Sequence, residues 1–190
     1  MPAELSNVVA IAGGGSHTLA LTVLIPTTTT LAASSQAIVS GQPLTLTATV
    51  SSANAGGVVK FYDGGANGTP LCTVAQVNGL AALTFASPRG GYHSFTAVYG
   101  GDDTYAPSVS VPVGVYVVGA PAAATLAAVA ATNGSRLSGM AAPNGTNTTC
   151  WFRWGVLGDD YPNTTVAQNV GGGFGVLSVT NQIPAPLPAI

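Results

Sequence analysis

The chain has 190 residues, of which only 5% are charged, and its formal net charge at pH 7 is -2. An ordinary soluble domain is about 25% charged, so Thr, Ser, Asn and Gly must hydrate this surface, and little charge repulsion opposes self-association. The four basic residues are too few and too scattered to neutralise a phosphate backbone, which argues against nucleic acid as a partner.

The composition predicts an all-β protein. The 25 glycines and 13 prolines disfavour long helices, and the frequent Thr and Val favour strands. The start MPAELSNVVAIAGGGSH lacks the basic and apolar regions of a secretion signal, so the signal has been removed or export uses another route. The uncharged run from Thr104 to Ser135 is interrupted by three prolines, so we expect no membrane span.

Residues 1–25 hold two apolar strand candidates, NVVAIAGGG and SHTLALTVLI, without a domain of their own. Ser16 and His17 are adjacent here, as a nucleophile and a base would be near one another. Neighbouring residues of a strand point to opposite faces, and no GxSxG pattern surrounds the serine. We therefore expect no catalytic role for this pair.

Residues 26–118 carry short strand patterns with turn signals about every ten residues. PLTLTATV alternates apolar and Thr residues, as in a half-buried strand, and Asn78-Gly79 is a hairpin signal. In SVSVPVGVYVV the five valines from Val109 to Val117 are expected on one face, and Pro112 suggests an edge strand. The pattern predicts an antiparallel β-sandwich.

Three runs, TTTTLAASSQAIVSGQPLTLTATV, VVKFYDGG and GYHSFTAVYGGDDTYAPSVS, resemble the bacterial Ig-like repeats of cell-surface and secreted proteins over residues 27–118. The resemblance implies an Ig-like sandwich without enzymatic activity. It also implies that AVYGGD ends the sixth strand, so Asp102 and Asp103 are expected in a solvated loop. Calcium is a weak alternative, because two adjacent Asp supply too few oxygen ligands. No other cofactor is expected.

The flanking segments resemble two further families, each in part. LSNVVAIAGGGSHTLALT, residues 5–22, is similar to the end of an RCC1-type propeller repeat. ATNGSRLSGMAAPNGTNTTCWFRWG and NTTVAQNVGGGFGVLSVTNQI, within residues 122–183, are similar to a fibronectin type III-like domain that lacks its last two strands. The predicted organisation is therefore an N-terminal strand segment (1–25), an Ig-like domain (26–118) and a partial fibronectin-like domain (119–190).

Several side chains are candidates for contacts or modification. Trp151 should lie on the opposite side of its strand from Cys150 and Phe152, so it is a possible platform for a ligand or a subunit, with core packing as the alternative. Cys72 and Cys150 fall in different predicted domains, so in an exported protein a disulfide would join domains or molecules; free buried thiols are the alternative. Five of the ten asparagines begin N-x-S/T and are glycosylation candidates: Asn67, Asn133, Asn144, Asn147 and Asn163.

Together these features predict an extracellular structural protein of a prokaryote that assembles with itself, and not an enzyme. The apolar strands at one end and the incomplete domain at the other suggest β-strand donation between subunits, from residues 7–25 to residues 122–190. The expected interface residues are Val8, Ile11, Leu19, Leu21 and Val23. The alternative is a cell-surface adhesion or glycan-binding module that presents Trp151 or the loop at 156–175.

Overall fold

The computed structural model describes residues 8–155 and 160–184. These residues form nineteen strands in six sheets and no helix, which confirms the all-β prediction, and no described segment could cross a membrane as a helix. The chain divides into two compact units. The first comprises the chain up to Gln36, Pro43–Ala86 and His93–Val115; the second comprises Ala37–Gln42, Ser87–Tyr92 and the chain from Tyr116 onward.

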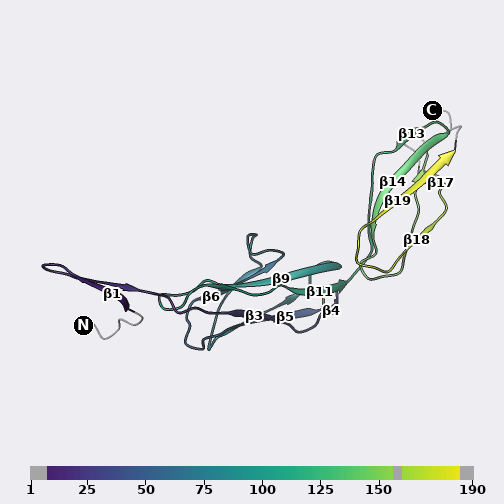
Figure 1. Cartoon of the computed structure of the whole chain (residues 1–190). Coiled ribbons are helices and arrows are strands. Elements are labelled where there is room, and N and C mark those ends of the chain that lie inside the picture. The colour runs from purple at the N-terminus through teal and green to yellow at the C-terminus, as the bar shows by residue number, and fades with distance from the viewer. Residues whose placement is uncertain (1–7, 156–159, 185–190) are drawn as a thin grey trace. The chain divides into compact units, whose positions relative to one another are not determined.

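Two sheets form the Ig-like sandwich (Figure 1). The smaller sheet has the order β3-β5-β8, with β3 at Thr29–Ala33, β5 at Pro43–Val50 and β8 at Leu80–Ala86. The larger has the order β4-β11-β9-β6-β7, and a short strand, β10, also pairs with β9. Its strands are β4 (Ala37–Val39), β6 (Val58–Asp63), β7 (Cys72–Ala75), β9 (Gly91–Tyr99), β10 (Ser108–Val109) and β11 (Val113–Val118).

The core of the sandwich comes from alternating residues of both sheets. In β5 the buried residues are the apolar ones, as predicted, while the threonines lie toward solvent. The side chains with no solvent exposure are Leu44, Leu46, Ala48, Val59, Phe61, Phe95, Ala97, Tyr99, Val115 and Val117. Burial of a large apolar side chain contributes about 1.5–3 kcal/mol, so this cluster supplies most of the stability of the sandwich. The predicted Ig-like sandwich is confirmed.

The prediction that Val109 to Val117 share one face is wrong. Ser110 lies buried between the exposed Val109 and Val111. Its N–H donates to the Ala97 carbonyl at 2.9 Å, and its Oγ accepts from the Ala97 N–H at 3.0 Å, so a side chain replaces the backbone in the ladder. This irregularity, followed by Pro112, inverts the alternation between β10 and β11. Nor is β11 an edge strand, because it lies between β4 and β9.

The N-terminal segment forms a separate β-hairpin. Strands β1 (Val8–Gly13) and β2 (Thr18–Thr22) pair with each other and with no other described strand. The Gly14 N–H donates to the His17 carbonyl at 2.7 Å across the turn. After the hairpin, Ile25 is tied to the sandwich, because its N–H donates to the Thr104 carbonyl and its carbonyl accepts from Ala106, both at 2.8 Å.

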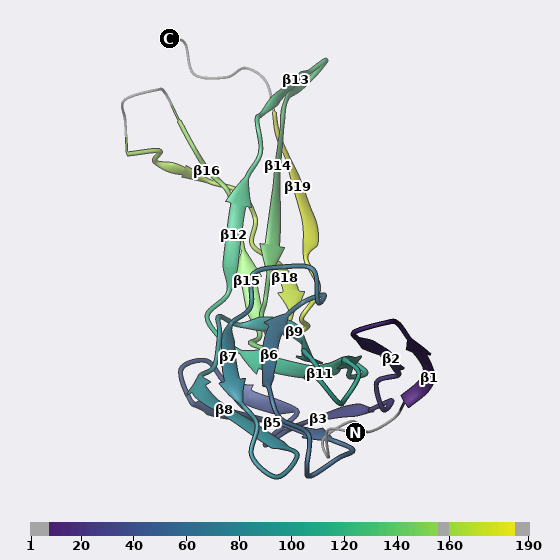
Figure 2. The same cartoon turned by 90° about the vertical axis from the view of Figure 1, so that its left-hand side faces the viewer.

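The C-terminal part of the second unit is a smaller β-structure. The long strand β14 (Gly134–Ala142) pairs on one side with β12 (Ala122–Thr125) and β13 (Val129–Ala131), and on the other with β19 (Leu177–Pro184), as Figure 2 shows for β12, β14 and β19. Two short pairs complete it. They are β15 (Thr148–Cys150) with β18 (Gln168–Gly171), and β16 (Arg153–Trp154) with β17 (Asn163–Thr164).

The core of this second structure is thin. Among the described residues after Gly119, the buried apolar side chains are Ala141, Pro143, Val179 and Ile183. The large apolar side chains left exposed in the same part are more numerous: Leu126, Val129, Trp151, Tyr161, Val166, Val176 and Leu177. An antiparallel sheet needs a covered apolar face to be stable, so this structure has unused capacity to bury a further apolar element.

Candidate assembly interface

The two adjacent carboxylates Asp102 and Asp103 have different roles. Asp102 Oδ1 accepts hydrogen bonds from the N–H groups of Thr104 at 2.8 Å and Tyr105 at 2.7 Å, and its Oδ2 accepts from Gly56 at 2.5 Å. These bonds, led by that from Thr104, hold the pKa of Asp102 below its usual range. Asp103 is exposed. Asp102 therefore organises the loop, because both of its carboxylate oxygens accept hydrogen bonds from backbone N–H groups.

Burial, together with the charge of Asp102, raises the pKa of Tyr99 at the end of β9. Tyr99 belongs to the core of the sandwich, with no solvent exposure, and the Asp102 loop follows it in the chain. This loop is the part of the sandwich to which Ile25 is tied, so Asp102 also fixes the point from which the N-terminal hairpin leaves the sandwich.

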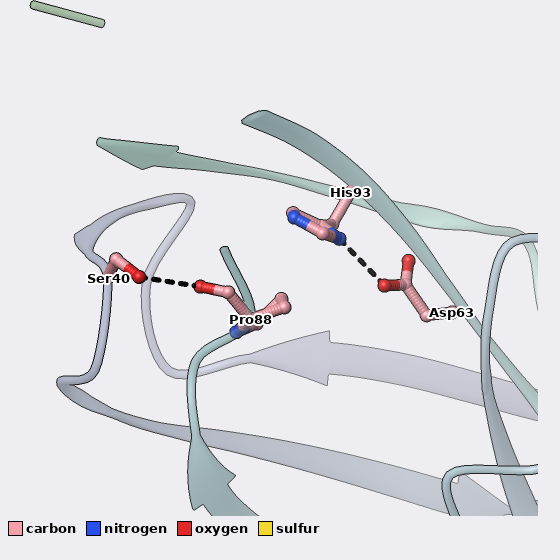
Figure 3. Close-up of polar contacts among 4 residues, drawn as sticks. All are labelled: Ser40, Asp63, Pro88 and His93. Atoms are coloured by element: carbon pink, nitrogen blue, oxygen red, sulfur yellow. Dashed lines mark hydrogen bonds and ion pairs between the residues drawn. The ribbon is translucent and has the colours of Figure 1, made fainter. Parts of the chain in front are cut away.

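His93 and Asp63 form a polar pair of side chains on neighbouring strands (Figure 3). His93 Nδ1 lies 2.7 Å from Asp63 Oδ2, and the imidazole stacks on Phe95 with ring centroids 6.0 Å apart. The pair links β6 to β9. The Ser40 hydroxyl donates to the Pro88 carbonyl at 2.9 Å in the second unit. Within residues 8–155 and 160–184, no three His, Cys, Asp or Glu side chains lie together as a metal site would require.

The N-terminal hairpin exposes several large apolar side chains. Ile11, Leu19 and Leu21 are 52%, 68% and 62% exposed, and Val23 is also exposed, whereas Val8 is half-buried. The strands carry no charged residue between Val8 and Thr22. A two-stranded hairpin is marginally stable in water, so one that exposes large apolar side chains needs a partner surface.

The predicted interface residues do not share one face of this hairpin. Paired residues lie on the same face, and the register pairs Ala12 with Leu19, Ala10 with Leu21 and Ile11 with Ala20. Leu19 and Leu21 therefore form a leucine face, and Ile11 lies on the opposite side. That all five residues fill the core of the next subunit stays a prediction. The register shift between Val8 and Ala10 changes the facing within β1.

Trp151 lies beside a small cleft in the second unit. The indole is 55% exposed, and Cys150 and Phe152 on either side are half-buried, so the predicted alternation of facing is present. The cleft has a volume of about 60 Å³ and is lined by Ala123, Ala124, Thr125, Gly139, Met140, Ala141, Cys150, Trp151, Phe152 and Val179. It is too small for a sugar ring but could accept an apolar side chain. Part of the loop at 156–175, residues 156–159, lies outside the described residues.

Both cysteines are free, half-buried thiols, Cys72 on β7 and Cys150 on β15. A disulfide between the two domains of one chain stays a prediction, with free buried thiols as the alternative. A disulfide between two molecules stays a prediction.

The glycosylation candidates differ in accessibility. Asn144 is buried, and its Nδ2, the atom that would carry a glycan, donates to the Ala120 carbonyl at 2.8 Å. The folded protein therefore does not present Asn144. Asn67, Asn133 and Asn147 are exposed and Asn163 is half-buried, so these four stay candidates.

The facing sheets and their shared core define an Ig-like β-sandwich module. Residues 29–118 match the sequence model of the family described as bacterial Ig-like domain (group 3). Domains of this kind typically occur in surface proteins and are typically not enzymes. No curated protein matches the chain. The match agrees with the resemblance noted for residues 27–118; those of residues 5–22 and 122–183 stay predictions.

The sequence does not indicate which strand edge would accept a strand donated by another subunit. The sequence assigned this edge to residues 122–190 without naming an element, whereas the structure shows that β19 pairs along one side only among the described strands. The signal in the sequence is weak. LSVTNQIP is a strand-like run without charge, but nothing local to it tells which of its two edges is used.

Proposed function

We propose that this chain is an extracellular structural protein of a prokaryote, the subunit of a self-assembling filament, sheath or surface layer. The observation that carries the proposal is the β1–β2 hairpin, an uncharged two-stranded element whose leucine face has no partner among the described residues. The Ig-like domain supports it, since such domains typically belong to surface proteins.

The energetics favour burial of the hairpin in another surface. Full burial of one leucine side chain contributes about 1.5–3 kcal/mol, so Leu19 and Leu21 together offer several kcal/mol to an interface. Because the net charge is only -2, electrostatic repulsion between copies opposes this association only weakly. The hairpin is thus the element through which we expect one subunit to hold the next.

The thin core of the β12–β19 structure makes it the expected receiver. Addition of a strand to a sheet satisfies backbone groups and, where the strand has an apolar face, enlarges the core. The giving and receiving surfaces differ, so the contact is heterologous and produces a filament unless it closes into a ring.

Negative-stain electron microscopy with sedimentation of the native protein tests the proposal. We expect filaments or sheets that appear above a critical concentration and dissociate on dilution. A species that sediments as a monomer at every concentration reached, with no polymer on the grid, would contradict it.

A second candidate function, a surface adhesion or glycan-binding module, is favoured by one observation, the exposed Trp151 at the rim of a small cleft. Aromatic faces of this kind bind sugar rings through stacking. Binding of the monomer to a glycan array, with loss on the substitution Trp151→Ala, would support this function. Assembly that persists in Trp151→Ala, without glycan binding by the parent chain, would favour the structural role.

An exported protein can carry N-linked glycans and intermolecular disulfides, and both can be measured. Intact mass measurement of the native protein would show glycans as mass above the 18.6 kDa of the chain. We expect any N-linked glycan at Asn67, Asn133, Asn147 or Asn163 and none at Asn144. Non-reducing electrophoresis would show whether Cys72 or Cys150 joins two molecules.

A further inference from the structure

Strand β19 has a long edge that no described strand uses. It pairs with β14 in eight consecutive residue pairs, from Leu177 with Ala141 to Pro184 with Gly134, without a register shift. Its other edge has no strand partner within residues 8–155 and 160–184. An uninterrupted strand of this length is a ready template for a further strand.

One hydrogen bond identifies the backbone groups on the open edge. The Thr180 carbonyl accepts from Gln168 Nε2 at 2.8 Å, so it points away from β14. In an antiparallel ladder alternate residues direct both their N–H and C=O groups to the same side. Ser178, Thr180 and Gln182 therefore present their backbone groups outward. The Gln168 amide occupies the position where a strand N–H would donate.

This edge lacks the usual protection. Natural edge strands carry charges, bulges or prolines that prevent pairing with another chain. Residues 177–184, LSVTNQIP, contain no charge, the ladder has no bulge, and the proline stands at the last position. The Gln168 side chain is a cap that an incoming strand can displace with an equivalent hydrogen bond.

The inner face of β19 is largely apolar. Val179 and Ile183 are buried on it and the half-buried Asn181 lies between them, while Ser178, Thr180 and Gln182 are exposed on the outer face. A strand added beside β19 extends the thin core if it carries apolar residues two positions apart on one side. Leu19 and Leu21 of the leucine face have this spacing.

The free edge of β2 suits this pairing better than that of β1. Its ladder with β1 is regular from Leu21 to Thr18, whereas β1 is distorted between Val8 and Ala10. The hydrogen bond from the Gly14 N–H to the His17 carbonyl shows that the backbone groups of His17 point toward β1, and this direction alternates along β2. On this alternation Thr18, Ala20 and Thr22 direct their backbone groups away from β1. Ala20 then lies on the face opposite the leucines, as Thr180 lies opposite Val179.

We propose that β2 of one molecule pairs with the open edge of β19 of a second copy, with Ala20 opposite Thr180, with Leu19 and Leu21 beside Val179 and Asn181, and with the Gln168 amide displaced. This inference rests on the proposed function, which requires a contact between subunits but names no edge. It makes the contact a continuous sheet, from β12 and β13 through β14 and β19 of one molecule to the hairpin of the next.

Disulfide trapping in the full-length chain tests the pairing. In a Cys72→Ser, Cys150→Ser background, protein with Ala20→Cys is mixed with protein that carries Thr180→Cys, and mild oxidation should give a covalent dimer. The matched control replaces Thr180→Cys with Val166→Cys, which is 82% exposed in the same unit but outside β19. Equal cross-linking by the control, or none at position 180 in protein that assembles, would overturn the proposal.

The substitution Thr180→Pro gives an independent readout. Proline is tolerated at an edge position whose N–H faces outward, so the monomer should unfold at the temperature of the parent chain. Loss of one hydrogen bond and the steric clash should raise the critical concentration at least about tenfold. Gln168→Ala, which removes the cap, should lower it. If the parent chain assembles and Thr180→Pro assembles equally well, β19 is not the acceptor; if the parent chain never assembles, the proposed function itself fails.

Discussion

A single carboxylate organises the loop at one end of the sandwich. Asp102 accepts hydrogen bonds from three backbone N–H groups, two of its own loop and one from Gly56. Bonds between a charged acceptor and backbone donors are stronger than neutral ones. In a chain with six acidic residues, this one is used to shape the backbone, which explains why acidic residues stand between aromatic residues without forming a reactive site.

The substitution Asp102→Asn should lower the midpoint of thermal unfolding at pH 7. The hydrogen bonds hold the folded pKa below the value of about 3.9 for an unfolded Asp. The stabilisation is therefore complete above that value and is lost as the pH falls through the folded pKa. Circular dichroism melts should show a difference between parent and variant that is largest near neutral pH and disappears in strong acid.

Asp103→Asn is the matched control, because it removes the same charge from the exposed neighbour. Its midpoint should stay close to that of the parent chain. A loss as large as that of Asp102→Asn would show that net charge, and not the backbone hydrogen bonds, causes the effect.

At the scale of elements, apolar strand residues serve two purposes in this chain. Those of β5, β6 and β9 are buried in the sandwich, whereas those of β1 and β2 are exposed. The two sets have similar composition, so the difference lies in what the strands pair with. Leu46 and Leu19 represent the two sets, since one has no solvent exposure and the other is mostly exposed.

Leu46→Ala should destabilise the monomer by about 2–5 kcal/mol, because it leaves a cavity in a packed core. Leu19→Ala should change the free energy of unfolding of the monomer by less than about 0.5 kcal/mol, as expected for an exposed side chain. The same variant should weaken assembly. Chemical denaturation of the dilute proteins measures both values, and an equal loss in the two variants would show that the hairpin is part of the monomer core.

The sequence predicts a strand correctly where apolar and polar residues alternate regularly, because this alternation shows which side chains point into the core. β5 is one such strand, since its apolar residues are buried in register. β10 and β11 were not predicted correctly, because the Ser110 hydroxyl enters the ladder and shifts the phase. The facing of Ile11 relative to the leucines follows from the pairing of β1 with β2, in which Ile11 lies opposite Ala20, and the sequence alone does not give this register. Which edge of β19 is left unpaired depends on pairing between strands that are distant in the sequence, and the residues of β19 alone do not indicate it.

At the scale of the whole molecule, two β-structures of unequal completeness share one nearly uncharged chain. The Ig-like sandwich has a full core and is preceded by an apolar hairpin, and the β12–β19 structure has few buried apolar side chains and an open edge on β19. The hairpin lacks a surface that would cover its apolar side chains, and the edge of β19 lacks a partner strand, so each supplies what the other lacks. A contact between unlike surfaces of identical molecules extends without limit when it does not close.

Assembly should depend little on ionic strength. The proposed contact uses backbone hydrogen bonds and apolar side chains, and neither β2 nor β19 carries a charge. Salt screens interactions between charges and has little to act on here. Light scattering should give a critical concentration that changes by less than about threefold between low and physiological salt, and falls with sulfate, which strengthens apolar burial. Dissolution of the polymer by moderate sodium chloride would point to ion pairs instead.

Removal of residues 1–22 tests the central claim most directly. The cut leaves Val23 to Ile25 in place, so the hydrogen bonds of Ile25 to Thr104 and Ala106 persist and the sandwich should melt as in the full chain. Ultracentrifugation of matched concentrations should find the full chain in the pellet and the shortened chain in the supernatant. A synthetic peptide of residues 7–25 should block growth of the full chain by occupying its acceptor sites. Polymer that forms unchanged without residues 1–22 would contradict strand donation as the basis of assembly.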